Sequence, residues 1–66
     1  MKMSQEAVKR FVLLTLQSTG QAAEPALIAD ATSLPLDDVT WVLDRLRDEE
    51  RVRCRVTRGR EWWEAV

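Results

Sequence analysis

Five arginines lie in the last sixteen residues of the chain, and their spacing suits contact with phosphate groups. They are Arg51, Arg53, Arg55, Arg58 and Arg60. A guanidinium donates hydrogen bonds in a planar fork that matches a phosphate, and arginine also fits the narrow minor groove of DNA. We therefore predict that these five arginines contact nucleic acid.

The same arginines have a structural explanation if the C-terminal segment forms a hairpin. Arg53 would then pair with Glu64 across the strands, and Arg55 would stack on Trp62. The two arginines at the tip have no intramolecular partner in this pattern except Glu61. The tip arginines are therefore the better candidates for binding a ligand.

A second candidate surface lies on a helix predicted over residues 35–50. The side opposite its core stripe carries Asp37, Trp41, Asp44 and Asp48. Carboxylates are repelled by the phosphates of duplex DNA, whereas an exposed tryptophan within a polar rim is typical of protein interfaces. Helix-dipole compensation is the alternative for Asp37, and partial burial is the alternative for Trp41. Thr40 is the residue of this helix that we assign to nucleic acid.

Residue types that carry catalysis or bind metals are scarce. The chain has no histidine and one cysteine, Cys54, so zinc sites, internal disulfides and histidine-based acid–base chemistry lack their usual groups. The carboxylates are predicted on exposed helical faces, without a glycine-rich phosphate loop. We therefore expect no enzyme, no catalytic or metal-binding residue, no cofactor and no small-molecule substrate.

Charge is divided unevenly along the chain. The net charge is −1, but residues 1–50 carry five basic and nine acidic side chains, whereas residues 51–66 carry five arginines and two glutamates. An acidic body with a basic C-terminal segment argues against unspecific nucleic-acid binding by the whole surface. The longest apolar run is only Phe11–Leu14, so we expect no signal peptide, no membrane partner and a cytoplasmic protein.

Periodicity and capping predict three helices over residues 4–19, 25–32 and 35–50. The inward stripe of the first is predicted as Ala7, Val8, Phe11, Val12, Leu14, Thr15 and Leu16, which leaves Leu13 outside. The second has its apolar side at Leu27, Ile28 and Ala31, and the third at Leu36, Val39, Val42, Leu43 and Leu46. Together with Trp63, we expect Phe11, Leu43 and Leu46 to be largely buried.

Alternation of charged and apolar residues predicts a C-terminal antiparallel hairpin over residues 51–66, with Arg58-Gly59 at its tip. The predicted pairs are Val52–Ala65, Arg53–Glu64, Cys54–Trp63, Arg55–Trp62 and Val56–Glu61. This register turns Val52, Cys54, Trp63 and Ala65 towards the core. Residues 21–23 are long enough for a short third strand beside the hairpin.

The buried framework resembles that of winged helix-turn-helix domains of small bacterial and archaeal regulators. Its residues are Leu34-Pro35, Val39, Leu43, Leu46 and Val52. The closing Arg60-Glu61-Trp62-Trp63 is similar to the C-terminal end of FeoC-like winged-helix proteins, which are associated with ferrous iron transport. The cysteine cluster of that family is missing, so no iron–sulfur role is implied. Many winged-helix sequences have glycine after the recognition helix, where this chain has Glu50.

These patterns predict one winged helix-turn-helix domain over residues 1–66, mainly α with a small β-hairpin, which places it among α+β folds. The predicted function is DNA binding in transcriptional regulation, with double-stranded DNA as partner. The contacts are predicted to come from the arginine-rich hairpin over residues 51–66, which is called the wing. The alternative is a protein-interaction module that binds a protein partner, or forms a homodimer, through the acidic Trp41 face.

Overall fold

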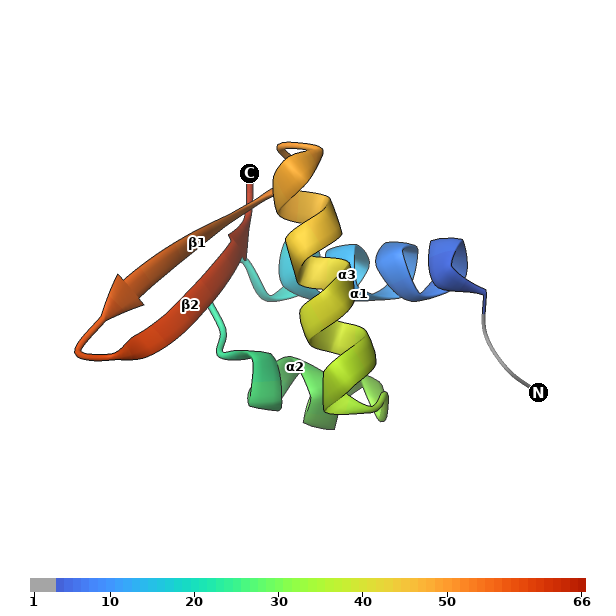
Figure 1. The fold of residues 1–66 in the computed structure, drawn as a ribbon, viewed down its shortest axis with the longest axis horizontal. Coiled ribbons are helices and arrows are strands. Elements are labelled where there is room, and N and C mark those ends of the chain that lie inside the picture. The colour runs from blue at the N-terminus through green and yellow to red at the C-terminus, as the bar shows by residue number, and fades with distance from the viewer. Residues whose placement is uncertain (1–3) are drawn as a thin grey trace.

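Three helices precede a two-stranded hairpin in the computed structural model, which describes residues 4–66 (Figure 1). The elements are α1 (Gln5–Thr19), α2 (Pro25–Thr32), α3 (Leu36–Asp48), β1 (Val52–Thr57) and β2 (Arg60–Ala65). Figure 1 shows α3 crossing in front of α1, while the hairpin projects away from the three helices. This is the winged helix-turn-helix predicted from the sequence, and the predicted fold class is confirmed.

Local signals set the ends of the helices. Ser4 caps α1, since its side chain accepts a hydrogen bond of 3.2 Å from the Ala7 amide, and Gly20 ends α1 in the left-handed conformation at φ +64°. Pro25 opens α2, where its missing N–H costs no helical hydrogen bond. Ser33, at φ +59°, then turns the chain towards α3.

The end of α3 carries backbone strain. Glu50 lies at φ +60°, a conformation that favours glycine. Its amide donates to the Arg47 carbonyl at 2.9 Å, and the Arg51 amide donates to the Leu46 carbonyl at 2.8 Å. These two bonds close a Schellman motif, which holds Glu50 in the left-handed region and directs the chain into β1.

The hairpin has the predicted register. All five predicted pairs are observed, with Thr57–Arg60 as the pair next to the tip. Arg58 and Gly59 both have positive φ, which is the type I′ turn of two-residue hairpins. Ala23 also forms a bridge to Trp63, with both backbone hydrogen bonds at 2.8 Å, so the predicted third strand is present as a single residue pair.

The core lies between the three helices and the inner face of the hairpin. Its buried hydrophobic residues are Val8, Val12, Leu13, Leu16, Ala23, Ile28, Val39, Val42, Leu43, Leu46, Val52 and Trp63. Cys54 and Ala65 are partly buried against this cluster, so the predicted inner face of the hairpin is confirmed. Among the tryptophans, Trp63 is the buried one, at 3% exposure.

The predicted inward stripe of α1 is partly wrong. Phe11 is 40% exposed and Leu14 is 53% exposed, whereas Leu13 is buried. The reason is that α1 contacts α2, α3 and β2, and these three neighbours cover a wide arc of the helix. At 100° per residue, Leu13 falls at the edge of this arc, while Leu14 falls on the opposite side.

Three predicted core positions in α2 and α3 are also exposed. Leu27 and Ala31 face solvent in α2, and Leu36 in the first turn of α3 is 47% exposed. The short α2 buries one stripe, Ile28 and Thr32, and the Thr32 hydroxyl donates to the Ile28 carbonyl at 2.7 Å.

No helix within residues 4–66 has the length and apolarity needed to cross a membrane.

Candidate nucleic-acid interface

The outer face of the wing, opposite the core, carries the predicted strand arginines. Side chains alternate along a strand, so this face consists of Arg53, Arg55, Thr57, Arg60, Trp62 and Glu64. Arg53 and Arg55 share one carboxylate, because both pair with Glu64, at 3.4 and 3.2 Å. Their side chains are nevertheless 68% and 72% exposed. Two arginines on one glutamate leave a net positive charge on this face.

Arg60 has a partner that the sequence pattern did not predict. Its guanidinium contacts Glu24 at 3.2 Å, a residue 36 positions earlier, just before α2. The prediction that the tip arginines had no partner except Glu61 is therefore wrong for Arg60. Glu61 instead accepts a hydrogen bond of 3.1 Å from the Trp63 indole nitrogen.

Arg58 and Arg51 differ from the other wing arginines. Within residues 4–66, neither takes part in an ion pair. Arg58 occupies the first position of the type I′ turn and is exposed at the far end of the hairpin. Arg51 is exposed at the opposite end, between α3 and β1. Arg58 is thus an exposed cation with no described carboxylate partner.

An open groove runs over the outer face of the wing. It is lined by Ala22, Arg55, Thr57, Arg58, Arg60 and Trp62. The predicted stacking of Arg55 on Trp62 is absent, since the cation–π contacts of residues 4–66 join Arg45 to Trp41 and Arg47 to Trp63. Arg55 turns to Glu64 instead, and Trp62 is left half-buried among three arginines.

The acidic Trp41 face of α3 lies on the surface as predicted. Trp41 is 39% exposed, and the guanidinium of Arg45 lies 4.9 Å from its ring centre. Asp44 pairs with Arg47 at 3.3 Å, whereas Asp48 is exposed and forms no ion pair within the described residues. Asp37 is also exposed in the first turn, where its charge suits the helix dipole.

Thr40 is exposed on α3, and its hydroxyl is engaged locally. The hydroxyl donates to the Asp37 carbonyl at 3.0 Å, one turn earlier in the helix. The oxygen still has free lone pairs, so Thr40 can accept a hydrogen bond from a ligand.

Cys54 lies on the inner face of the hairpin and is only partly accessible. Burial raises the pKa of its thiol, and the charges of Glu61 and Asp44 add to this while that of Arg47 opposes it. A raised pKa favours the unreactive thiol form at neutral pH. Among residues 4–66, no cluster of histidine, cysteine or acidic side chains is placed to hold a metal ion.

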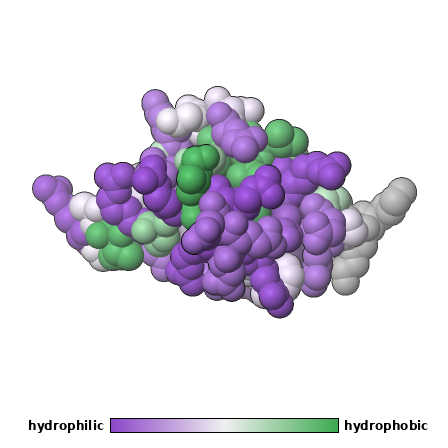
Figure 2. Space-filling view, turned by 90° about the horizontal axis from the view of Figure 1, so that it is seen from above, coloured by the Kyte–Doolittle hydropathy of each residue, from purple (hydrophilic) through white to green (hydrophobic). Residues whose placement is uncertain are grey.

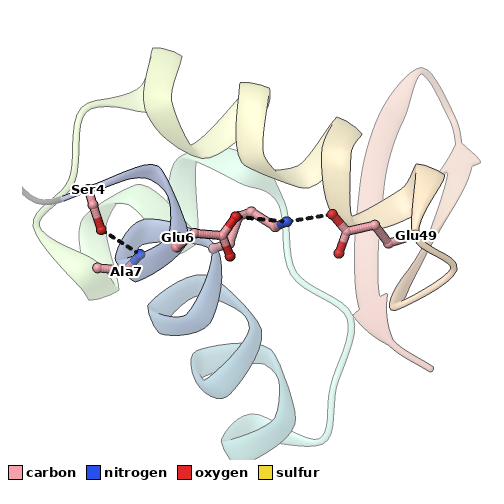
Figure 3. A network of polar contacts seen from close by, with 5 residues as sticks. Ser4, Glu6, Ala7 and Glu49 are labelled. Carbon is pink, nitrogen blue, oxygen red and sulfur yellow. Dashed lines mark hydrogen bonds and ion pairs between the residues drawn. The ribbon is translucent and has the colours of Figure 1, made fainter.

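A polar network joins α1 to the end of α3. Figure 3 shows the carboxylates of Glu6 and Glu49 on either side of the Lys9 ammonium, and Ser4 capping the helix at Ala7. The Lys9 side chain is 17% exposed, and its hydrogen bond to Glu49 raises the pKa of its ammonium above the ordinary value. These residues are not among those that line the groove, and the network is a contact between α1 and the end of α3.

The fold and the arginine-bearing hairpin define a winged helix-turn-helix protein. Comparison with protein-family models gives no match, and comparison with curated proteins gives none either. Among solved structures, the chain is similar to ZitR of Lactococcus lactis, a zinc-responsive MarR family member, with a TM-score of 0.77 and 17% sequence identity. The similarity covers 100% of this chain and 45% of that chain, so this chain spans less than half the length of ZitR. The likeness supports the fold, and the resemblance to FeoC-like proteins stays a prediction.

Proposed function

We propose that the chain binds double-stranded DNA as a transcriptional regulator, with the wing supplying most of the phosphate contacts. The observation that carries this proposal is Arg58, an exposed arginine at the tip of a hairpin that projects beyond the helices (Figure 1). Winged-helix regulators such as members of the MarR family support the proposal by analogy of fold. The compartment that fits is the cytoplasm, where a lone cysteine stays a reduced thiol.

The ion pairs of the wing rank its arginines as phosphate ligands. Arg58 is free to bind phosphate, because it takes part in no ion pair within the described residues. Arg51 takes part in none either, but it follows three acidic residues in the sequence, Asp48, Glu49 and Glu50. Arg53 and Arg55 already share Glu64, and Arg60 must loosen its contact with Glu24. We therefore expect Arg58 to contribute more to affinity than Arg60.

The acidic residues of α3 limit how this helix can take part. Asp44 and Asp48 would approach phosphates if α3 entered the major groove, and their repulsion would weaken binding. Thr40 is the neutral polar residue of this surface that can reach a base or a phosphate. In the proposed complex, the wing provides attraction and α3 provides few favourable contacts.

A titration of labelled 20-base-pair duplex by fluorescence anisotropy, repeated between low and moderate salt, tests this proposal. Each phosphate contact contributes about 0.9 to the slope of log affinity against log salt. Arg58→Ala should reduce that slope by about one contact, while Arg10→Ala, which removes the same charge from α1, should leave it unchanged. Asp48→Asn should strengthen binding. Absence of duplex binding at low salt would refute the proposal.

A second candidate function is supported by the exposed Trp41 among acidic residues. A tryptophan with 39% exposure and a polar rim suits a protein partner with a basic surface, or a second copy of the chain. Sedimentation across a range of concentrations and affinity capture from lysate test this candidate. Trp41→Ala should abolish an association while the fold persists. A monomer at all concentrations, with no captured partner, would exclude it.

A further inference from the structure

We infer that the outer face of the wing binds single-stranded nucleic acid, with an unpaired base stacked on Trp62 and its phosphates held by the arginines around it. This site goes beyond the duplex binding proposed above. It uses the aromatic ring of Trp62 to stack an unpaired base, and a fully paired duplex has no such base. The occupant we assign is a single strand of DNA or RNA, without base specificity.

The position of Trp62 in the sheet carries the first step. Strand β2 pairs with β1 on one side and with Ala23 on the other, so it is the middle strand at this level. Trp62 lies directly opposite Arg55, and Arg60 lies two residues away on the same face of β2. The indole is therefore placed near the centre of a small sheet surface, with cationic side chains on two sides.

The lining of the groove carries the second step. Three of its six residues are arginines, one is Trp62, and the remaining two are Ala22 and Thr57. Among the described residues that line the groove, none carries a carboxylate. Glu64 and Glu24 contact Arg55 and Arg60 at 3.2 Å each, so they restrain two guanidinium groups without occupying the groove. A guanidinium has five N–H donors, and donors remain on each arginine for a phosphate.

The chemistry of this surface selects its ligand. Proteins that bind single strands combine a positive groove along the backbone with aromatic side chains on which bases stack. A protein partner with an acidic surface would use the arginines but would have no need for the indole. The groove is open and has no glycine-rich phosphate loop, which suits a passing strand better than an enclosed mononucleotide. An aromatic platform between arginines thus matches a polyanion that carries flat bases.

The chain offers a matched control for the test. Trp41 is a second partly exposed tryptophan, on α3 and outside the groove. We would titrate a labelled 12-nucleotide oligothymidine against the wild type, Trp62→Ala, Trp62→Phe and Trp41→Ala at low salt. An abasic oligonucleotide of equal length presents the same phosphates without bases. Circular dichroism confirms that each variant is folded.

The expected result is that Trp62→Ala weakens binding of oligothymidine about 5- to 150-fold, the effect of losing one stacked base. Trp62→Phe should retain most of the affinity, and Trp41→Ala should retain all of it. The abasic strand should bind the wild type more weakly than oligothymidine does. Its affinity should be the same for the wild type and for Trp62→Ala. Equal losses for the two tryptophan variants, or equal binding of normal and abasic strands, would overturn the inference.

The same variants separate this inference from the proposed function. Arg58 belongs both to the groove and to the wing tip, so its removal should weaken both ligands. Trp62→Ala should leave the affinity for blunt duplex unchanged. If the wild type binds oligothymidine but not duplex, the proposed function is refuted and this inference stands. If the wild type binds duplex but Trp62→Ala does not weaken binding of oligothymidine, this inference is refuted and the proposed function stands. If Trp62→Ala fails to fold, the comparison of normal with abasic strands on the wild type still decides the outcome.

Discussion

Replacing Glu50 by glycine should stabilise the protein, because Glu50 ends α3 in a conformation that glycine adopts without strain. At φ +60° a residue with a Cβ atom costs about 1–2 kcal/mol. Glycine also has a larger conformational entropy than alanine in the unfolded chain, which destabilises the folded state by about 0.4–1 kcal/mol. The net gain over alanine at position 50 should be about 0.5–1 kcal/mol, the difference between these two effects.

The comparison with alanine separates the backbone from the charge. Glu50→Ala removes a negative charge near the helix C-terminus, where acidic groups are unfavourable by about 0.3–1 kcal/mol at most. Glu50→Gly removes the same charge and also the Cβ atom. The difference between the two variants therefore reports the left-handed backbone alone.

Thermal and urea unfolding followed by circular dichroism would measure this difference. In a domain of this size, 0.5–1 kcal/mol corresponds to roughly 2–8 °C in Tm. Glu49 provides the reverse control, since its φ of −86° is ordinary. At position 49, the Glu49→Gly variant should be less stable than the Glu49→Ala variant. If glycine is no better than alanine at position 50, the Schellman geometry assigned to this turn is refuted.

Two further predictions concern the core and the contact between α1 and α3. Trp63→Ala should lower the free energy of unfolding by about 3–5 kcal/mol, because Trp63 is buried. Trp62→Ala should lower it clearly less, because Trp62 is only half-buried. The opposite order in urea unfolding would mean that the wrong tryptophan is assigned to the core. Lys9→Met should lower Tm at neutral pH, because the hydrogen bond to Glu49 raises the pKa of the Lys9 ammonium. A raised pKa means that this stabilisation is complete below the ordinary value of 10.5 and disappears as pH rises through the folded pKa. A Tm difference that stays constant from pH 7 to pH 11.5 would contradict it.

The hairpin was predictable from the sequence to the level of individual pairs, and α1 was not. A strand has a period of two, so a one-residue shift would place Glu64 opposite Cys54 on the half-buried face, and only one register satisfies burial. Residues 11–14 of α1 are all apolar, and a helix can turn either edge of such a run inward. Which edge is buried depends on how α2, α3 and β2 surround the helix, and that is a property of tertiary packing.

The candidate site was predictable in its residue types but only partly in its contacts. The alternation of residues placed Trp62 and the strand arginines on one face. The pair between Arg60 and Glu24 joins residues 36 positions apart, and no local spacing indicates it. Contacts of this kind require the path of the chain between α1 and α2, which brings Ala23 beside Trp63.

The distribution of charge restricts where a nucleic acid can lie on the wing. Seen from above, the surface is mostly hydrophilic, with only small hydrophobic areas (Figure 2). At the base of the hairpin, Arg51 follows three acidic residues at the end of α3, Asp48, Glu49 and Glu50. A phosphate near Arg51 would also approach these carboxylates, and the repulsion would offset much of the attraction. Within the described residues Arg58 takes part in no ion pair, and the carboxylate of Glu61, three residues further along the chain, accepts a hydrogen bond from Trp63 on the inner face. We therefore expect binding to be confined to the outer half of the wing, where Arg58 and the Trp62 groove lie together, with Arg51 contributing little.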